Sequence, residues 1–498
     1  DLNASRYTPS STLQRMELLK TGYMGTLSLG WDNYLFLELT GRQERSSTLK
    51  DQSFFYPSAN LSFLFTQAFH MPSWWNYGKL RLSYGIVGNA PETYTANIVY
   101  EQGSDNGFTW NTIPSSWGNA DIHPEKKYEY EIGLESKFLN NRLGIDISYY
   151  NNRVKDQILS TPQPSTSGVK NVLMNVGEVA NRGWDISISA TPILTRDFRW
   201  DLTANYGVYK NKVVKLADGV PYLEILNSGG SGIKIQAVEG QPMGDIYAQV
   251  PQVNENGEYL VSDKGLYLNQ TELQKVGNIN PAGVGGLFNS FSYKNVFLDF
   301  SIDFRIGGDV INEMNQYATA VGLTPESLKY RDTEHGGLSY YYPGDNNSSG
   351  IPVQVDPSTG AGPNGEIIYH DGIILPGVVA STGERNTRII PAGYYYNTTY
   401  NWGTEAEQLT YRHSVFDNSY VKLRELTIGY QFPEKMISKL GLGRLSVSVF
   451  GRNLFYFYKA LKNYDAESSV GTSWANQATV GSSTTATRSF GVSLRASF

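Results

Sequence analysis

Two carboxylates stand two positions apart near the end of the chain. Asp465 and Glu467 could in principle serve as the general acid and general base of a hydrolytic site. The alternative interpretation is a structural loop in which the carboxylates accept hydrogen bonds, and we favour it. The five histidines are scattered and offer no grouping with Ser and Asp for nucleophilic catalysis. We therefore do not expect an enzyme, and we predict no catalytic residue.

Two other segments resemble ion-binding loops only loosely. Asn254–Glu258 places oxygen ligands around Gly257, but it lacks the leading Asp and the distal Glu of a calcium loop, so a plain β-turn is the better interpretation. Gly283–Gly286 precedes a strand-like segment rather than a helix, which removes the helix N-terminus that glycine-rich phosphate loops use. The histidines also lack ligand spacing. The sequence therefore predicts no metal and no cofactor.

Aromatic side chains are the better candidates for binding. The chain holds 35 Tyr, 21 Phe and 9 Trp among its 498 residues. In long Gly- and Pro-rich segments, such rings can stack on sugars or cover peptide backbones, and they can equally pack between loops or against a partner protein. The candidate ligand-contacting residues are Trp110, Trp117, Tyr340, Tyr341, Tyr342, Tyr394, Tyr395, Tyr396 and Trp402.

The segments between these candidates alternate in polarity every second residue, which is the period of a β-strand. In Val296–Ile306 every even position is apolar, whereas Asp299, Asp303 and Arg305 occupy odd positions. Charged side chains on an inner face are costly in a dry sandwich core but not in a wet or plugged lumen. We interpret these three residues as lumen-facing, paired with one another or with a plug rather than with substrate.

The last strand-like segment, Ser489–Phe498, alternates to the final residue. On its own it fits a half-buried terminal strand of a soluble sandwich as well as a strand between lipid and lumen. The terminal Phe498 resembles the assembly signal of bacterial outer-membrane barrels.

Thirteen such segments are separated by connections that are alternately short and long. Because bacterial single-chain barrels close with an even number of strands, an odd count with every short turn on one side indicates that further strands precede Asp1 or belong to another chain. The segments are Thr21–Gly30, Tyr34–Glu44, Asn60–Phe69, Lys79–Val87, Tyr128–Phe138, Arg142–Asn151, Gly183–Thr191, Arg199–Tyr209, Gly286–Tyr293, Val296–Ile306, Tyr420–Phe432, Arg444–Leu454 and Ser489–Phe498.

Composition narrows the class of protein further. The chain has no cysteine, a net charge of −6 and no basic stripe, so disulfides, thiol chemistry and nucleic-acid binding are not expected. It contains no apolar run long enough for a transmembrane helix. Trp31, Trp74, Trp75 and Tyr293 lie near the short turns, where they fit either an aromatic girdle at a membrane interface or hairpin packing. Because Asp1 follows no start Met, we interpret the chain as a processed or partial polypeptide.

Six segments in order resemble the starch-utilisation-type (SusC-like) TonB-dependent transporters. NSYVKLRELTIGYQFP is similar to that family's YVRLRNLTLGYTLP strand, and the Tyr464–Glu467 segment is similar to its YDPE, with Ala466 in place of proline. The segments are Asn418–Pro433, Phe450–Phe455, Tyr464–Glu467, Glu239–Tyr247, Gly277–Tyr293 and Asp371–Val378, the last followed by Asn386 and Thr387.

The resemblance implies an all-β fold, namely a transmembrane antiparallel β-barrel in which this chain supplies about 13 of 22 strands, with long extracellular loops and the plug domain outside this chain. It implies one barrel domain over residues 1–498, within which residues 308–418 form a long extracellular loop region.

The resemblance also implies a function: TonB-dependent import of an oligosaccharide or peptide across the bacterial outer membrane. The implied partners are a SusD-like surface lipoprotein, TonB through a missing N-terminal segment and outer-membrane lipid, with a possible dimer of lipoprotein–transporter pairs. A siderophore or cobalamin receptor without a lid, and a barrel that serves as a scaffold in a surface complex, remain open as alternatives.

Overall fold

The computed structural model describes residues 15–50, 53–105, 108–228, 232–344, 350–401, 411–438, 441–468, 473–481 and 486–497. Its contacts divide the chain into two compact units. The first comprises Asp1–Ile186 and Tyr209–Pro221, and the second comprises Ser187–Val208 and Tyr222–Phe498. Trp402 and Phe498 lie outside the described residues, so the predictions made for them stay predictions.

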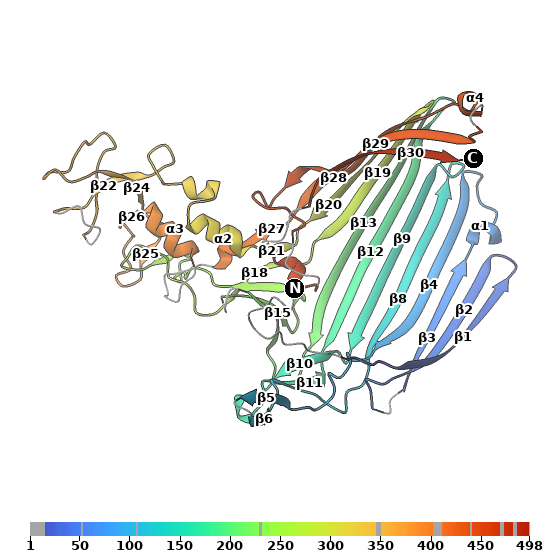
Figure 1. Ribbon diagram of the computed structural model, residues 1–498, viewed down its shortest axis with the longest axis horizontal. Helices are drawn as coiled ribbons and strands as arrows, with labels where there is room; N and C mark the ends of the chain where they lie inside the picture. The colour runs from blue at the N-terminus through green and yellow to red at the C-terminus, as the bar shows by residue number, and fades with distance from the viewer. Residues whose placement is uncertain are drawn as a thin grey trace, which may run out of the picture. The chain divides into compact units, whose positions relative to one another are not determined.

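The largest element is a 13-stranded sheet in which neighbours along the chain are neighbours in the sheet, as predicted (Figure 1). The pairs with a defined register are antiparallel. In order, the strands are β1 (Lys20–Trp31), β2 (Leu35–Ser46), β3 (Ser53–Phe63), β4 (Trp75–Asn89), β8 (Glu125–Phe138), β9 (Leu143–Lys155), β12 (Glu178–Leu194), β13 (Phe198–Lys215), β19 (Gly283–Tyr293), β20 (Val296–Ile306), β28 (Tyr420–Gln431), β29 (Arg444–Lys459) and β30 (Ser489–Ser497).

Strand register in the first unit keeps each face of the sheet uniform in polarity. Leu27 pairs with Leu39, Leu39 with Ala59, and Ala59 with Tyr84. Since directly opposed residues share a face, this row continues an apolar surface from strand to strand. The residues one position along form a polar row on the other face. There Arg81 of β4 forms an ion pair with Asp146 of β9, with 2.6 Å between Nη2 and Oδ1.

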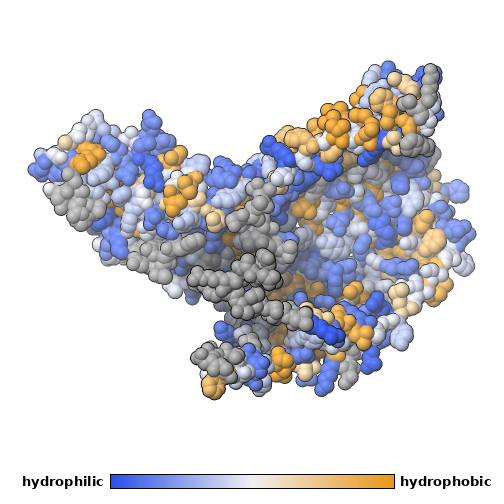
Figure 2. Space-filling view, viewed as in Figure 1, coloured by the Kyte–Doolittle hydropathy of each residue, from blue (hydrophilic) through white to orange (hydrophobic). Residues whose placement is uncertain are grey.

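The second unit repeats this division. Phe291 pairs with Leu298, Leu298 with Ile428, Ile428 with Val449, and Val449 with Val492. Three of these side chains are more than half exposed: Ile428 at 54%, Val449 at 57% and Val492 at 72%. Figure 2 shows apolar side chains gathered along the edge formed by β28–β30. The opposite face carries Asp299, Asp303 and Glu425, so the predicted alternation in β20 is confirmed.

The short turns depend on residues that tolerate a left-handed backbone. Asp32 and Asn33 (φ 48° and 60°) connect β1 to β2, and Asn140 and Asn141 (φ 57° and 62°) connect β8 to β9. Asn and Asp adopt this conformation at lower cost than other side chains, and consecutive positive φ angles match the twist of a tight hairpin. Two further short connections carry one helical turn each, α1 (Phe65–Ala68) and α4 (Glu434–Ile437).

The long connections carry the remaining elements of the described residues. In the first unit these are β5 (Glu101–Asp105), β6 (Phe108–Thr112), β7 (Ser116–Trp117), β10 (Ile158–Pro162), η2 (Ser165–Ser167) and β11 (Asn171–Asn175). In the second unit they are β14 (Tyr222–Ser228), β15 (Ile233–Val238), β16 (Asp245–Ala248), β17 (Leu260–Val261), β18 (Gln274–Asn278), β21 (Asp309–Ile311), α2 (Glu313–Ala320), η4 (Pro325–Leu328), β22 (Leu338–Tyr341), β23 (Val353–Gln354), β24 (Tyr369–Ile373), β25 (Val378–Val379), β26 (Ile390–Pro391), α3 (Ala392–Tyr400), η5 (Tyr411–Ser414), β27 (Val415–Asp417) and η7 (Asn476–Ala478). No helix among the described residues is both long and apolar enough to cross a bilayer.

The buried apolar clusters lie mainly in the long connections rather than on the sheet. One cluster collects Ile233, Ile235, Ile246, Ile311 and Val415, each at most 6% exposed. A second joins Leu266, Ile373, Leu375 and Ile390. Burial of apolar surface therefore stabilises the loop region, while the sheet exposes its apolar side chains.

The glycine-rich segment considered for phosphate binding forms the first residues of β19. Gly285 lies opposite Tyr206 on one side and Phe304 on the other, and these two rings stack over it with centroids 6.2 Å apart. A Cβ at Gly285 would lie 2.5 Å from the carbonyl oxygen of Asn205 and 2.6 Å from Cζ of Phe304. The glycine is therefore required by close packing of its neighbours.

This packing predicts a specific cost for adding one methyl group. Gly285→Ala should lower the free energy of unfolding by about 1–3 kcal/mol, because neither the backbone oxygen nor the stacked rings can yield without loss of contacts. Gly85→Ala is the matched control, since its Cβ would meet nothing nearer than 3.6 Å. Urea unfolding of the detergent-solubilised protein measures both, and equal stabilities would contradict the packing account.

Candidate functional site

Two irregularities in β28 and β29 create a charged cluster on the polar face. The β20–β28 register shifts between Ser301 and Ile302, which pair with Glu425 and Leu423, so Arg424 is an extra residue in β28. On its other side, β29 places two residues, Asn453 and Leu454, opposite Arg424. On β29, Asn453 adopts a left-handed conformation (φ 53°). The guanidinium of Arg424 donates from Nη1 to Oδ1 of Asn453 over 2.8 Å. β-Bulges often re-aim side chains in this way, and these two bring Arg424 and Asn453 together.

Arg424 joins the sheet to the connection between β29 and β30. Its Nη2 contacts Oδ2 of Asp303 and Oε1 of Glu467, both at 2.5 Å, and its Nη1 donates to Oε2 of Glu467 over 2.9 Å. The planar guanidinium therefore binds Glu467 with two parallel hydrogen bonds, which is the strongest geometry for such a pair.

Lys422 extends the cluster into the interior. It is only 2% exposed, its Nζ lies 2.5 Å from Oε2 of Glu467, and it sits 4.7 Å from the ring centre of Tyr456. The hydroxyl of Tyr456 donates to Oδ1 of Asp465, which also accepts from the backbone amide of Glu467 over 3.1 Å. A buried ammonium is tolerated only with such partners, so these contacts fix Lys422 and the loop together.

The electrostatics of the two loop carboxylates argue against acid–base catalysis. Burial by itself would raise the pKa of Glu467, but hydrogen bonds from Arg424 and Lys422 outweigh it and hold the pKa below the ordinary value. The pKa of Asp465 is lowered in the same way: burial raises it, and the hydrogen bond from Tyr456 more than offsets this effect. A general acid needs a raised pKa, so the arrangement fits the structural interpretation.

The three charged residues predicted to face a lumen have protein partners. Asp303 pairs with Arg424, which the sequence did not single out. Asp299 accepts a hydrogen bond from Ser290 over 2.6 Å. Arg305 donates to the backbone oxygens of Ile279 and Gly307. Contact with a plug stays a prediction.

The segments that resemble the family motifs make polar contacts that connect separate parts of the loop region. Asn418 donates to the carbonyl of Ala466 over 2.9 Å. Asn386, 3% exposed, donates to the carbonyl of Leu375. Asp245, fully buried, is held by the side chains of Lys275 and Asn278. These hydrogen bonds and the ion pair of Asp245 join separate segments and so fix loop conformation.

The first tyrosine triplet is part of a loop core. Tyr340, Tyr341 and Tyr342 are 1%, 9% and 5% exposed. Tyr340 stacks on Tyr369 with ring centres 5.5 Å apart, and its hydroxyl donates to Asp371. Burial and the neighbouring Asp371 raise the pKa of Tyr340. The structure thus shows the packing role for these rings, and their contact with a ligand stays a prediction.

The three tyrosines of the second triplet, on α3, differ in how far they are exposed. Tyr396 is 3% exposed and donates to the backbone oxygen of Glu326 over 2.8 Å. Tyr395 packs edge-on against Tyr396, whereas Tyr394 is 41% exposed. In the first unit, Trp110 is 46% exposed and Trp117 packs against Tyr100. Tyr394 and Trp110 are therefore the most accessible of the described aromatic candidates.

A polar hollow of about 560 Å³ lies between α2, α3 and the segment after β29. Asn463 donates to the side-chain oxygens of Asn315 and Glu326, over 3.1 and 3.2 Å. His413 stacks on Tyr400 with centroids 4.4 Å apart, and burial, aided by Arg412, lowers the pKa of His413 to about 4, so the imidazole is neutral at physiological pH. The lining also includes Thr319, Arg412, Val415, Phe416, Ala460, Leu461 and Lys462.

This hollow was not found from the sequence, because its lining comes from four separate stretches of the chain. It combines amide donors and acceptors, one carboxylate, two cationic side chains and an aromatic wall. Such a surface can hydrogen-bond a polar ligand, and it makes the hollow the best candidate binding site among the described residues.

The remaining candidates for catalysis or ion binding have structural roles. Ser339 and His370 lie 2.8 Å apart (Oγ to Nδ1), a pair that sequence reasoning missed, but Ser339 is 2% exposed and closed to a substrate. Asn254–Glu258 is a turn, in which Oδ1 of Asn254 accepts from the amides of Asn256 and Glu258. No group of three or more potential metal ligands was found among the described residues.

The fold and site together define a class. A large antiparallel sheet with one apolar and one polar face, short turns at one end and long structured connections at the other, is that of an outer-membrane-type β-barrel. Residues 3–251 match the family model described as TonB dependent receptor-like, beta-barrel. That match spans half of the 498 residues, and the chain belongs to this family.

Individual relatives agree with the resemblance to SusC-like proteins. The chain is 30% identical over 247 residues to TonB-dependent receptor SusC of Bacteroides thetaiotaomicron, covering 46% of this chain and 24% of that protein. It is 24% identical over 494 residues to TonB-dependent receptor P3 of Formosa agariphila, covering 90% of this chain and 42% of the relative. The RagAB peptide transporter structure has the same fold, with a TM-score of 0.66 at 19% identity, covering 93% of this chain and 47% of that one. The chain thus spans less than half the length of these relatives.

The charged cluster predicts how the loop responds to acid. Because the pKa values of Glu467 and Asp465 are lowered by folding, their contribution to stability is complete above the ordinary carboxyl pKa and is lost as the pH falls through the lowered values. The protection factors of residues 464–467, which correct the hydrogen-exchange rate for its intrinsic dependence on pH, should therefore fall between neutral pH and about pH 3. Arg424→Gln should lower the protection of residues 464–467 from hydrogen exchange already at neutral pH.

Arg452→Gln is the control for this experiment, since Arg452 is a more exposed arginine on the adjacent strand and pairs with Glu425 over 3.2 Å. It should leave exchange of residues 464–467 unchanged. Equal effects of the two substitutions would mean that the cluster does not anchor the loop.

Proposed function

We propose that this chain forms the strand and loop portion of a TonB-dependent importer that lies in the bacterial outer membrane. The observation that carries the proposal is the division of the sheet into an apolar face and a polar face. In this account the apolar face contacts lipid, and the polar face, with Asp299, Asp303, Arg305 and Arg424, borders the lumen. The short turns point to the periplasm and the long connections to the exterior.

The proposal includes parts that lie outside this sequence. Residues 1–498 would belong to a single barrel domain of 22 strands, completed by a plug and by a segment that TonB pulls. Residues 308–418 would form an extracellular loop region. We propose pairing with a SusD-like surface lipoprotein and a possible dimer of such pairs. Support comes from family membership and from the similarity to a protein named SusC.

For the substrate we propose an oligosaccharide or a peptide. The polar hollow suits either, because Asn315, Asn463 and Glu326 offer both donors and acceptors and Lys462 can meet an acidic group. Tyr394, which lies on α3 together with Tyr400 of the hollow, has an exposed aromatic ring. No covalent step on the substrate is part of the proposal.

Two alternatives remain. A siderophore or cobalamin receptor would use the same sheet without a lid lipoprotein. A structural scaffold in a surface complex would use the loop region to bind proteins and would transport nothing. Growth on a single nutrient separates import from the scaffold function, and co-purification of a lipoprotein separates the lidded importer from the lidless receptor.

Placement in a membrane makes a sharp prediction for adjacent residues of β20. Phe300→Arg should destabilise the protein in lipid vesicles by about 2–4 kcal/mol, because its position would face hydrocarbon near the middle of the strand. Ser301→Arg should cost far less, since that side chain faces Glu425 across the polar face. Phe300→Ala is a control that measures the cost of losing the aromatic ring without adding a charge. Urea titration in vesicles gives the comparison, and equal costs for the two arginine variants would overturn the membrane placement.

Import through the polar hollow predicts a selective loss of growth. In a strain whose own copy of the gene is deleted, the full-length protein with Glu326→Gln and Asn463→Ala should restore growth on a single oligosaccharide or peptide source at least tenfold less efficiently than the unaltered protein. Loss of the charge of Glu326 and of the amide of Asn463 from the binding site costs about this much or more. Ser358→Ala, on an exposed loop, is the control. Unchanged growth with normal protein abundance would remove the hollow from the pathway.

A further inference from the structure

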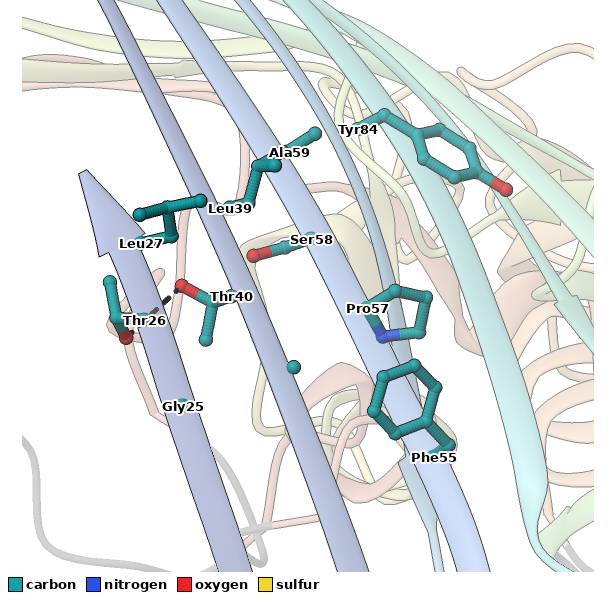
Figure 3. A pocket seen from close by; sticks show the side chains of 11 residues that line it. Gly25, Thr26, Leu27, Leu39, Thr40, Phe55, Pro57, Ser58, Ala59 and Tyr84 are labelled. Carbon is teal, nitrogen blue, oxygen red and sulfur yellow. Dashed lines mark hydrogen bonds between the residues drawn. The ribbon is translucent and has the colours of Figure 1, made fainter. Parts of the chain in front are cut away.

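The apolar face of the first unit has a hollow of about 540 Å³ on β1–β3, which we call the chain hollow (Figure 3). Its floor is a row of small residues, since Gly25 pairs with Gly41 and Gly41 with Pro57. A Cβ at Gly25 would meet nothing within 4 Å. Glycine in the interior of a strand often marks a place where a ligand approaches closely.

The walls of the chain hollow are apolar and exposed. Leu27, Leu39, Ala59 and Tyr84 form one side, and Phe55 closes the other, as the close-up shows. Leu27, Phe55 and Tyr84 are 52%, 58% and 48% exposed. The small residues lie at the middle of β1 and β2, so on the proposed membrane placement the chain hollow opens to hydrocarbon.

A second, smaller hollow of about 230 Å³ adjoins the same tyrosine, and we call it the headgroup hollow. Tyr84 lines both hollows, and Tyr84 pairs with Tyr130 in the sheet. Arg153 and Lys155, from the end of β9 next to a long connection, complete the lining with Tyr128, Glu129 and Asn151. Tyr84 therefore lies between an apolar space and a polar one, whose lining combines three tyrosines, two cations, one carboxylate and one amide.

Two side chains of like charge lie next to each other beside the headgroup hollow. Lys126 and Lys155 are directly opposed in the β8–β9 register. Like charges at this position repel, and the ion pairs found among the described residues include neither lysine. Lys155 instead lies over the ring of Tyr128, 5.8 Å from its centre, while Arg153 pairs with Glu178 over 2.9 Å.

We propose that the two hollows form one site for lipid A, the phosphorylated, multiply acylated lipid of the outer leaflet. One acyl chain would fill the chain hollow, and a phosphate would lie between Lys126 and Lys155. The cations sit at the strand ends beside the long connections, where the headgroups of the outer leaflet lie in the proposed orientation, and the apolar space sits at mid-strand, where acyl chains lie. The site rests on the proposed membrane placement but not on import.

The phosphate position follows from the chemistry of the lysines. Two ammonium groups on opposed strand positions can each donate to a phosphate oxygen, which converts repulsion into two charge-assisted hydrogen bonds. A tyrosine at the boundary of the two hollows suits an interface between apolar and polar phases. A zwitterionic phospholipid would offset its own phosphate charge, so it fits the paired lysines less well than lipid A.

The test uses the full-length protein in nanodiscs of phosphatidylglycerol, with and without added lipid A. Lipid A should raise the midpoint of thermal unfolding, and native mass spectrometry should show it bound. The double variant Lys126→Ser with Lys155→Ser should bind lipid A at least tenfold more weakly, because both charge-assisted contacts to the phosphate are lost. Lys79→Ser, on the polar face opposite Glu135, is the matched control and should bind normally.

A second variant tests the chain hollow independently of the charges. Gly25→Leu fills space that is open in the structure, so it should fold and still weaken lipid A binding. The proposal is overturned if lipid A stabilises the protein no more than phosphatidylglycerol does, or if the double lysine variant binds like Lys79→Ser. Either result leaves the import proposal intact, since growth on the nutrient is measured separately.

Discussion

The constraint on which the structure depends is the two-residue period of a β-strand combined with strict cross-strand register. Once Leu298 faces one side, register fixes Phe291, Ile428 and Val449 on that side and commits the intervening charged residues to the other. A single slip would place Asp299 and Asp303 among apolar neighbours, at a cost that no hydrogen bond there could offset. The sheet thus has one apolar and one polar face, and the connections between its strands have to be compatible with both.

The long connections show the consequence. Because the apolar side chains of the sheet are exposed, the buried apolar clusters lie mainly in the long connections, where Ile233, Ile246 and Ile311 form a core. The polar face in turn provides the charges that anchor those loops. Arg424, displaced by a bulge, binds Asp303 of the sheet and Glu467 of the loop at once. The polar hollow takes its lining from separate segments of these connections.

Strand positions, face assignment and the tight turns could be predicted from the sequence, because period-two polarity and Asp or Asn at turns are local signals. The site could not. Arg424 has the same pattern as any alternating polar residue, and only the bulges at Arg424 and Asn453 show the direction of its side chain. The tyrosines of 340–342 look like binding residues but are buried against Tyr369. The polar hollow joins residues more than a hundred positions apart, and no local pattern encodes such contacts.

The most direct test of the two-faced sheet uses the absence of cysteine from this sequence. Single cysteines placed in turn at residues 299–304 of β20, in the full-length protein in lipid vesicles, report their surroundings to a water-soluble thiol reagent and to a lipid-confined quencher. The account predicts a strict alternation, with 299, 301 and 303 reacting in water and 300, 302 and 304 quenched by lipid. Uniform reactivity along the strand would contradict it, and so would the opposite phase.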